Sequence, residues 1–303
     1  MQQATPARNR LYAQSLLILL LALWTLPSLA ATAVRTSYVS IPVSQDGTTW
    51  QLAAKLNYPQ DITTGAAVLI VHGSGGVDSR GALHTESLNN SGLATLEIDL
   101  WGARGWVGQQ TGRPRGVPET LPDVFAALDF LQHLDGINPD RIGLLGFSWG
   151  GVVSMLVRNK QNQARYGAGG DIDQGLAANV AFYPVCWVYN KVPGYELTEL
   201  RKTPLLIQTG EKDDYDSPTS CTDWQASLPE QDRRHVDITV YRNAYHGFNT
   251  SAPAAEVTDP FSHQGKGGKV IMKANKSARK RADKATVKFF IQHLVNSSGD
   301  TPS

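Results

Sequence analysis

Residues 146–150 read Gly-Phe-Ser-Trp-Gly, and Ser148 at their centre is the residue best suited to act as a nucleophile. The apolar residues 141–147 read as a buried strand, and residues 151–157 are compatible with a helix. A sharp turn between strand and helix holds a serine in a strained conformation with its hydroxyl exposed, and flanking glycines remove side chains that would collide. The pattern therefore predicts a nucleophile for acyl transfer. The alternative is a glycine-rich turn with a buried serine.

A serine needs a base to take its proton and a carboxylate to orient that base. In a strand-turn-helix arrangement of this kind the order along the chain is Ser, Asp, His. Residues 203–209 read as another buried strand, and the loop after them carries Asp213, Asp214 and Asp216. Ligands bind at the carboxyl ends of parallel strands. We take Asp213 as the acid, with Asp214 as the alternative and Asp216 as a weaker one.

The base is expected at His246, in the loop that follows the alternating residues 236–241. His263, in a loop rich in glycine and lysine, is the competing histidine. His72 follows the first core strand and is expected to pack beneath the site as a structural residue. The other histidines are expected to be ordinary polar residues of surface loops or helices: His84, His133, His235 and His293.

Two backbone N–H groups are expected to bind the oxyanion. The N–H of Trp149 would lie at a helix N-terminus, and residues 72–76 form a glycine-rich turn that offers the N–H of Ser74. A phosphate-binding loop is the rival interpretation of that turn. It lacks the Lys-Ser or Lys-Thr pair of a P-loop and the spacing of a dinucleotide motif, which argues against this rival.

These motifs, in this order, resemble those of the dienelactone hydrolase family of α/β-hydrolases, from about residue 37 to residue 295. The resemblance implies a triad of Ser148, Asp213 and His246, Ser74 and Trp149 N–H groups as the oxyanion hole, and no metal or organic cofactor. The family's founding enzymes have a cysteine nucleophile where this chain has Ser148 and a glutamate where it has Gly73, so a general esterase is expected. The matching runs are residues 71–74, 99–105, 138–143, 146–150, 210–214 and 245–248.

The whole sequence predicts an α/β-hydrolase fold, with a mostly parallel, doubly wound sheet and an N-terminal antiparallel hairpin. The hairpin is indicated by Asp46-Gly47 between two alternating runs. Strands alternate with helical stretches such as residues 121–134 and 277–295, which is typical of right-handed parallel crossovers. Core strands are expected to begin at Ala66, Leu93, Arg141, Ala177, Pro204 and Val236.

Residues 1–30 differ from the rest of the chain. Arg8 and Arg10 precede the apolar residues 16–24, and small residues follow. This pattern predicts a secretory signal peptide, cleaved near Ala30, and a single domain over residues 31–303. An uncleaved membrane anchor is the alternative. The signal peptide predicts a secreted or periplasmic location. A glycan on the sequon at Asn249 would obstruct the site, so a bacterial exported protein is favoured.

Export gives a role to the two cysteines, Cys186 and Cys221. An oxidising compartment permits a disulfide between them. Closing a loop of about 35 residues would stabilise the fold by about 3 kcal/mol, and the bridge would tether the loop of Asp213. The alternative is two buried thiols.

Aromatic side chains in the loops after the strands predict an acyl pocket, with Trp101 and Trp187 as substrate contacts. Arg104 would pair either with a substrate carboxylate or with an internal acid. The formal net charge of +1 becomes −1 without the two arginines of the signal segment, so no nucleic acid is expected as a partner. The loop aromatics are Trp101, Trp106, Trp149, Trp187, Tyr189 and Tyr215.

A small-molecule ester or lactone is the expected substrate, and membrane contact is expected only through the signal segment. Eight Lys or Arg residues between Lys266 and Lys284 suit a solvated helix face, or else an anionic surface or substrate. Two other functions stay open. One is a small serine peptidase, and the other is a non-catalytic binding protein on a hydrolase scaffold.

Overall fold

The computed structural model describes residues 33–60, 62–105, 114–166, 176–197 and 199–296. These residues all belong to one compact unit, Thr32–Ser303. The expected signal peptide and Trp106 lie outside the described residues. Within the described ranges, no helix has both the length and the apolar character needed to cross a membrane.

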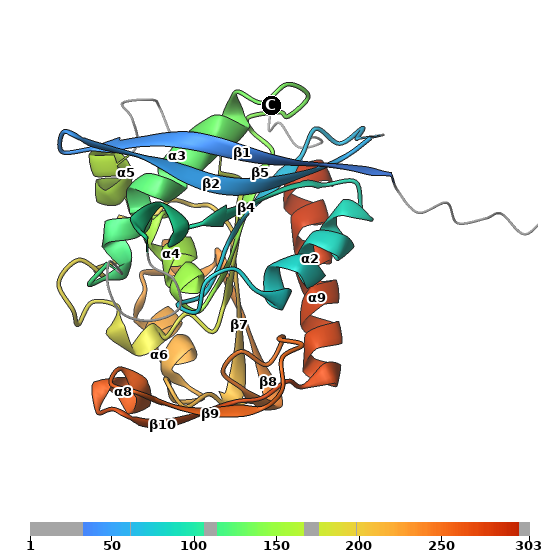
Figure 1. Ribbon diagram of the computed structural model, residues 1–303. Coiled ribbons are helices and arrows are strands. Elements are labelled where there is room, and N and C mark those ends of the chain that lie inside the picture. Colours follow the sequence, from blue (N-terminus) through green and yellow to red (C-terminus); the bar gives the residue numbers. More distant parts are fainter. Residues whose placement is uncertain (1–32, 61, 106–113, 167–175, 198, 297–303) are drawn as a thin grey trace, which may run out of the picture. The chain divides into compact units, whose positions relative to one another are not determined.

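An eight-stranded sheet forms the centre of the unit, in the order β1-β2-β4-β3-β5-β6-β7-β8 (Figure 1). The strands from β4 to β8 run parallel, while β1 and β2 are antiparallel to each other and β2 is antiparallel to β4. The α/β-hydrolase fold and the antiparallel hairpin are thus confirmed. The strands are β1 (Val34–Gln45), β2 (Thr48–Pro59), β3 (Ala67–Val71), β4 (Ala94–Asp99), β5 (Ile142–Phe147), β6 (Ala178–Phe182), β7 (Leu205–Lys212) and β8 (Val236–Tyr245).

The six core strands begin within one residue of the expected positions. The hairpin of β1 and β2 turns at Asp46 and Gly47, which both have positive φ, as a two-residue turn between twisted strands requires. The chain runs from β3 out to β4 and then back across β3 to β5. The strand order therefore reverses between β3 and β5, and the loops after these two strands open a crevice there.

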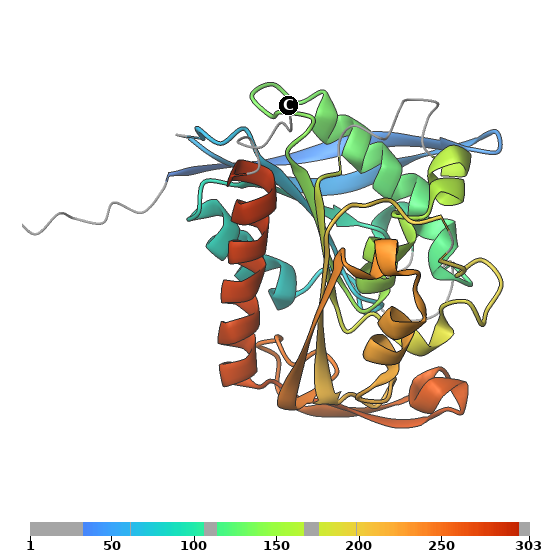
Figure 2. The same cartoon turned by 180° about the vertical axis from the view of Figure 1, so that it is seen from behind.

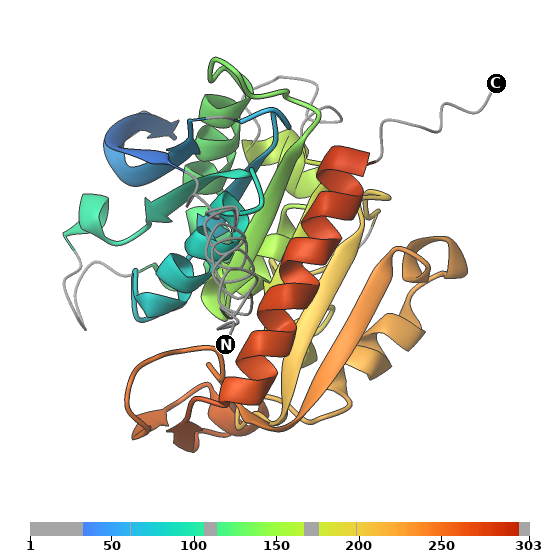
Figure 3. The same ribbon diagram turned by 90° about the vertical axis from the view of Figure 1, so that its right-hand side faces the viewer.

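Helices cover both faces of the sheet (Figures 2 and 3). One face carries α2 (Ser79–Asn89) and α9 (Lys276–Phe290), and the other carries α3 (Leu121–Gln132), α4 (Trp149–Leu156) and α6 (Ser220–Ser227). Buried apolar side chains form one cluster on each face. The shorter elements are α5 (Lys160–Tyr166), α7 (Glu230–Arg233), η1 (Gly102–Arg104), η2 (Val117–Thr120), η3 (Cys186–Val188) and η4 (Ile291–Val295).

A second, two-stranded sheet interrupts the chain between β8 and α9. It consists of β9 (Ala255–Asp259) and β10 (Gly268–Met272), joined through the turn α8 (Ser262–Gly265). We call residues 255–272 the cap hairpin. It lies at the bottom of Figure 1, past the ends of β7 and β8. The sequence predicted only a loop here, because each strand has only five residues and these are largely exposed, so the pattern is weak.

Candidate active site

Ser148 stands at the turn between β5 and α4 with φ 51° and ψ −106°, a strained conformation for a residue with a side chain. The neighbouring glycines are required by close backbone packing. A Cβ on Gly146 would lie 1.9 Å from the carbonyl oxygen of Gly150, and a Cβ on Gly150 would lie 2.1 Å from that of Val71. The turn therefore has the geometry expected of a nucleophile elbow.

Ser148, Asp213 and His246 come together in one hydrogen-bonded chain. His246 Nε2 lies 2.9 Å from Ser148 Oγ, and His246 Nδ1 lies 2.8 Å from Asp213 Oδ2. The second carboxylate oxygen of Asp213 accepts a hydrogen bond from the N–H of Tyr215 at 2.9 Å. Asp213 and His246 are buried. With Nδ1 donating to the carboxylate, Nε2 can accept the serine proton.

The structure gives the two alternative acids other partners. Asp214 Oδ2 accepts from the N–H of Ile271 in β10, so this side chain anchors the cap hairpin. Asp216 accepts from the N–H groups of Cys186 and Ser217. Burial raises the pKa of Asp216 to about 6, although these hydrogen bonds oppose the shift. Both side chains hold the loop together and leave the contact with the histidine to Asp213.

The competing histidine belongs to the cap hairpin, where His263 Nε2 lies 2.9 Å from the carbonyl oxygen of Lys269. His72 is buried beneath the site, as expected of a structural residue. Its Nδ1 lies 2.6 Å from the carbonyl oxygen of Gly73, and its Nε2 accepts from the N–H of Leu100. Burial lowers the pKa of His72, which favours the neutral ring and a fixed tautomer.

The oxyanion donors expected from the sequence lie at the mouth of a cavity. Ser74 follows β3 in the turn where the N–H of Gly76 donates to the carbonyl of Gly73, and Trp149 begins α4 directly after Ser148. Ser74, Ser148 and Trp149 all line the same cavity. The strand order makes this possible, because the neighbouring strands β3 and β5 deliver both turns to one edge of the sheet.

The cavity has a volume of about 500 Å3, within the usual range for small-molecule sites. Its lining is mainly apolar, so an uncharged, apolar part of a substrate fits best. Trp187 lines it, as expected for a substrate contact. The other lining residues include Val117, Val152, Val185, Val188, Val192, Tyr195, Tyr215, Asp259, Phe261 and Arg115.

Two expected substrate contacts have structural positions instead. Arg104 donates two hydrogen bonds to the buried carboxylate of Asp123, at 2.6 and 3.1 Å, so the internal ion pair is the alternative that holds. Trp101 is buried and packs edge-on against Trp149, with ring centroids 5.3 Å apart. It supports the wall of the site from behind, because a buried ring offers no surface to a substrate.

Two tyrosines pack against the imidazole of His246. The ring centroids of Tyr183 and Tyr215 lie 4.6 and 4.4 Å from that of His246. Tyr183 is fully buried, donates to Asn249 Oδ1, and has its pKa raised by burial to about 12. Tyr183 was not predicted from the sequence, although its position directly after β6 places it at the edge of the sheet where ligands bind.

A buried cation beneath the site was also missed. Arg80, in α2, forms an ion pair with Asp78, and its guanidinium would lie 3.4 Å from a Cβ on Gly73. Burial alone would raise the pKa of Asp78, but the hydrogen bonds and charge of Arg80 hold it below its usual value. The next turn of α2 carries His84, which is buried beside Asp283. The expectation that His84 is a surface residue is therefore wrong.

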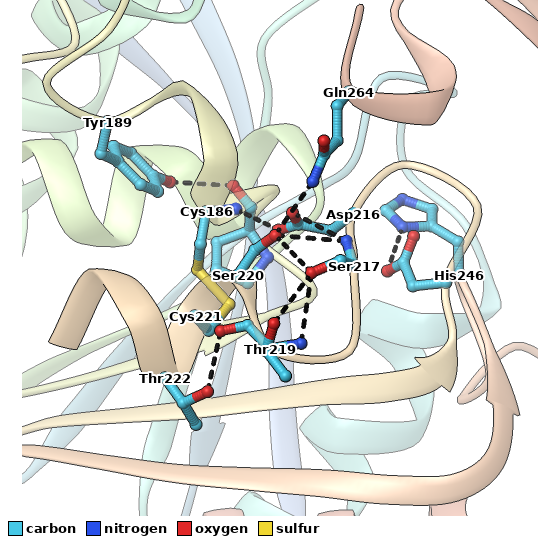
Figure 4. The surroundings of a disulfide bond; sticks show 12 residues. Cys186, Tyr189, Asp216, Ser217, Thr219, Ser220, Cys221, Thr222, His246 and Gln264 are labelled. Atoms are coloured by element: carbon cyan, nitrogen blue, oxygen red, sulfur yellow. Dashed lines mark hydrogen bonds and ion pairs between the residues drawn. A yellow bond between two sulfur atoms is a disulfide. The ribbon is translucent and has the colours of Figure 1, made fainter. Parts of the chain in front are cut away.

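A disulfide joins Cys186 of η3 to Cys221 of α6, with the two Cα atoms 5.0 Å apart (Figure 4). The predicted bridge is thus present. Trp187 of the cavity wall directly follows Cys186, and Asp216 accepts from the Cys186 N–H. The bridge therefore links the cavity wall to the loop that carries Asp213, as Figure 4 shows around Asp216 and Ser220.

Comparisons with known proteins agree with this architecture. The sequence profile described as "Dienelactone hydrolase family" matches residues 52–294. A probable 2-oxo-3-(5-oxofuran-2-ylidene)propanoate lactonase from Bradyrhizobium sp. is 24% identical over 136 residues, which are 43% of this chain and 49% of that protein. The match thus spans about half the length of that relative.

Two solved structures share the fold at low sequence identity. Dienelactone hydrolase from Anabaena variabilis has a TM-score of 0.53 at 19% identity, with 86% of this chain and 99% of that chain covered. Esterase 2 from Thermogutta terrifontis has a TM-score of 0.56 at 14% identity, with 88% and 96% covered. Because the family profile spans every strand from β3 to β8 and includes the elbow at Ser148, the chain belongs to the dienelactone hydrolase family.

Proposed function

We propose that this protein hydrolyses carboxylic esters or lactones through an acyl-enzyme intermediate on Ser148. The observation that carries the proposal is the position of His246, which reaches Ser148 Oγ with one ring nitrogen and Asp213 with the other. Ser148 of this triad faces an apolar cavity that can take an acyl or alcohol group. Family membership supports the same chemistry.

In the proposed reaction, His246 Nε2 takes the hydroxyl proton as Ser148 Oγ attacks the carbonyl carbon. Asp213 stabilises the imidazolium that forms, and the N–H groups of Ser74 and Trp149 bind the developing oxyanion. His246 then gives its proton to the leaving alkoxide, and the ester bond breaks. Water, activated by the neutral imidazole, attacks the acyl-enzyme and restores Ser148. Each oxyanion donor would lower the barrier by about 3 kcal/mol.

The test is a panel of p-nitrophenyl esters and lactones of increasing length, with the wild type and Ser148→Ala compared on each. We expect Ser148→Ala to lower kcat by at least about 10⁴-fold. Equal rates for the two proteins would refute the proposal. Peptide p-nitroanilides in the same panel test the peptidase alternative, which predicts cleavage of these amides by the wild type and its loss in Ser148→Ala.

Covalent labelling separates an enzyme from a binding protein on a hydrolase scaffold. The Thermogutta esterase was solved after phosphorylation by paraoxon, so an organophosphorus probe suits this fold. We expect a fluorophosphonate to label the wild type on Ser148 and to leave Ser148→Ala unlabelled. Absence of labelling in a folded wild type would favour the binding protein.

We also propose that the protein works outside the cytoplasm, as a secreted or periplasmic enzyme. The Cys186–Cys221 disulfide supports this location, because structural disulfides persist in oxidising compartments. N-terminal sequencing of the protein recovered from its native cells tests the expected cleavage near Ala30. An intact N-terminus on protein recovered from the cytoplasm would contradict it.

A further inference from the structure

The cap hairpin and the loop that carries the acid are joined by backbone hydrogen bonds. We call residues 213–220 the acid loop. The N–H of His263 donates to the carbonyl oxygen of Asp214 at 2.7 Å, and the N–H of Gln264 donates to that of Tyr215 at 3.3 Å. The side chain of Gln264 reaches Ser220 at the far end of the acid loop, as Figure 4 shows. The cap hairpin thus acts as a brace along the acid loop.

Tyr215 contacts both the triad and this brace. Its N–H donates to Asp213, and its ring lies against the His246 imidazole with centroids 4.4 Å apart. Its hydroxyl donates to Asp259 Oδ2 at 2.8 Å, at the end of β9. One residue therefore connects the acid, the base and the cap hairpin.

Asp259 uses both of its carboxylate oxygens. While Oδ2 accepts from the Tyr215 hydroxyl, Oδ1 accepts from the N–H of Phe261 at 2.8 Å. Tyr215, Asp259 and Phe261 all line the cavity beside Ser148. The carboxylate thus fixes the far end of the Tyr215 ring and the turn at the cavity rim at the same time.

We propose that Tyr215 is a positioning residue for the triad and that Asp259 holds it in place. The inference rests on the proposed function and deepens it. The anchored ring limits rotation of the imidazole and keeps His246 Nε2 within reach of Ser148. Without the anchor the Tyr215 ring rotates, and the histidine spends less time in the reactive geometry. We expect the loss to fall mainly on kcat, because the anchor acts on the geometry of the imidazole.

The test uses p-nitrophenyl acetate, whose acyl group is small, and measures kcat and KM separately. Tyr215→Phe keeps the ring and removes the hydroxyl, and Asp259→Ala removes its acceptor. We expect each to lower kcat about tenfold with KM within about twofold of the wild type. The double variant should lose no more than either single variant, because both break the same contact.

Asp259→Asn is the conservative variant that separates positioning from charge. Its amide oxygen can accept from the Phe261 N–H while its NH2 group donates to the Tyr215 hydroxyl, which accepts as well as donates. We expect it to keep kcat within about threefold of the wild type. The matched control is Tyr38→Phe, which removes the hydroxyl of a tyrosine that is 82% exposed on β1, and it should change nothing.

Two results would overturn the inference. One is a folded Tyr215→Phe with the kcat of the wild type, and the other is an equal loss of kcat in Asp259→Asn and Asp259→Ala. Thermal melting of every variant identifies loss through unfolding, and the Asp259 pair decides the question even where Tyr215→Phe does not fold. Failure of the proposed function is a separate result, since the rate would then be independent of Ser148.

Discussion

The turn that carries Ser148 and the acid loop that carries Asp213 are held in different ways. The turn is packed between central strands, where the backbone of Gly150 approaches that of Val71 and the N–H of Ser148 donates to the carbonyl of Phe182. Backbone atoms of the sheet and of α4 supply these contacts. The serine is therefore fixed by the fold itself, and the surrounding residues have almost no room to change.

The acid loop follows β7, next to the outermost strand β8, and relies on added contacts. A disulfide ties it to η3, and the cap hairpin braces it through the Asp214 side chain and the Tyr215 hydroxyl. Besides the two backbone hydrogen bonds from His263 and Gln264, these contacts are made by side chains that can be replaced one at a time. We therefore expect a single substitution in the turn of Ser148 to disrupt its geometry completely. A single substitution among the contacts that hold the acid loop should disrupt the loop only in part.

The largest effect is expected within the acid loop, from Asp213→Asn. An amide in this place donates to His246 Nδ1 or accepts only weakly, so the imidazole loses the tautomer that can receive the serine proton. We expect kcat to fall by about 10⁴-fold. Asp214→Asn is the matched control, because its amide oxygen still accepts from the Ile271 N–H, and kcat should stay within about threefold. Steady-state kinetics on one ester decide, and equal losses would contradict the assignment of Asp213.

Next comes the packing of the elbow. A Cβ on Gly150 would lie 2.1 Å from the Val71 carbonyl oxygen, a backbone atom that cannot swing aside. We expect Gly150→Ala to lower the free energy of unfolding by about 3 kcal/mol or more, measured by urea denaturation. Gly75→Ala is the control, because no atom lies within 4 Å of the added Cβ. Equal stability of the two variants would remove the contrast between the two regions.

The disulfide tests the acid side of the comparison. The bridge joins residues 35 positions apart, so Cys186→Ala/Cys221→Ala should lower the free energy of unfolding by about 3 to 4 kcal/mol. Activity of the folded variant should fall only in part, because the cap hairpin still braces the acid loop. Reduction of the wild type should reproduce both effects. A complete loss of activity in a folded variant would show that the bridge alone positions Asp213.

The smallest effect is expected from a buried acid, Glu97, on the strand next to β3. Glu97 of β4 faces Gly81 of α2, its Oε1 has no hydrogen-bond partner among the described residues, and burial raises its pKa to about 7. Because this pKa exceeds the usual 4.5, the contribution of Glu97 to stability is fully present below about pH 4.5 and is lost as the pH rises to about 7.

Glu97→Gln removes this titration while keeping the shape of the side chain. We expect the variant to be more stable than the wild type by about 2 kcal/mol at pH 8 and equally stable at pH 4. Urea denaturation at the two pH values measures the difference. A variant that is less stable at pH 8 would show that the charged carboxylate has a favourable partner.

Local patterns in the sequence predicted the parts that local physics decides. The elbow needs glycine on both sides of Ser148, and short apolar runs located the core strands within one residue. The order Ser, Asp, His selected three residues that the structure brings within hydrogen-bond distance. The pairing of Cys186 with Cys221 followed from their number and their position beside two neighbouring strands.

Contacts between distant residues left no such pattern. The Tyr215 hydroxyl meets Asp259 across 44 positions, and Arg104 meets Asp123 in a different element. Neither pairing has a local signature, so Arg104 remained ambiguous and Asp259 went unnoticed. The strands of the cap hairpin have only five residues each and are largely exposed, which explains why a loop was expected there.

Phe261 is a suitable position at which to change the entrance of the cavity in this enzyme. Its ring is 61% exposed on the cap hairpin while it borders the cavity beside Ser148. Replacement of so exposed a side chain changes folding free energy by only about 0.5 kcal/mol. A small library at this single position would reshape the entrance for bulkier esters and spare the crowded backbone around the nucleophile.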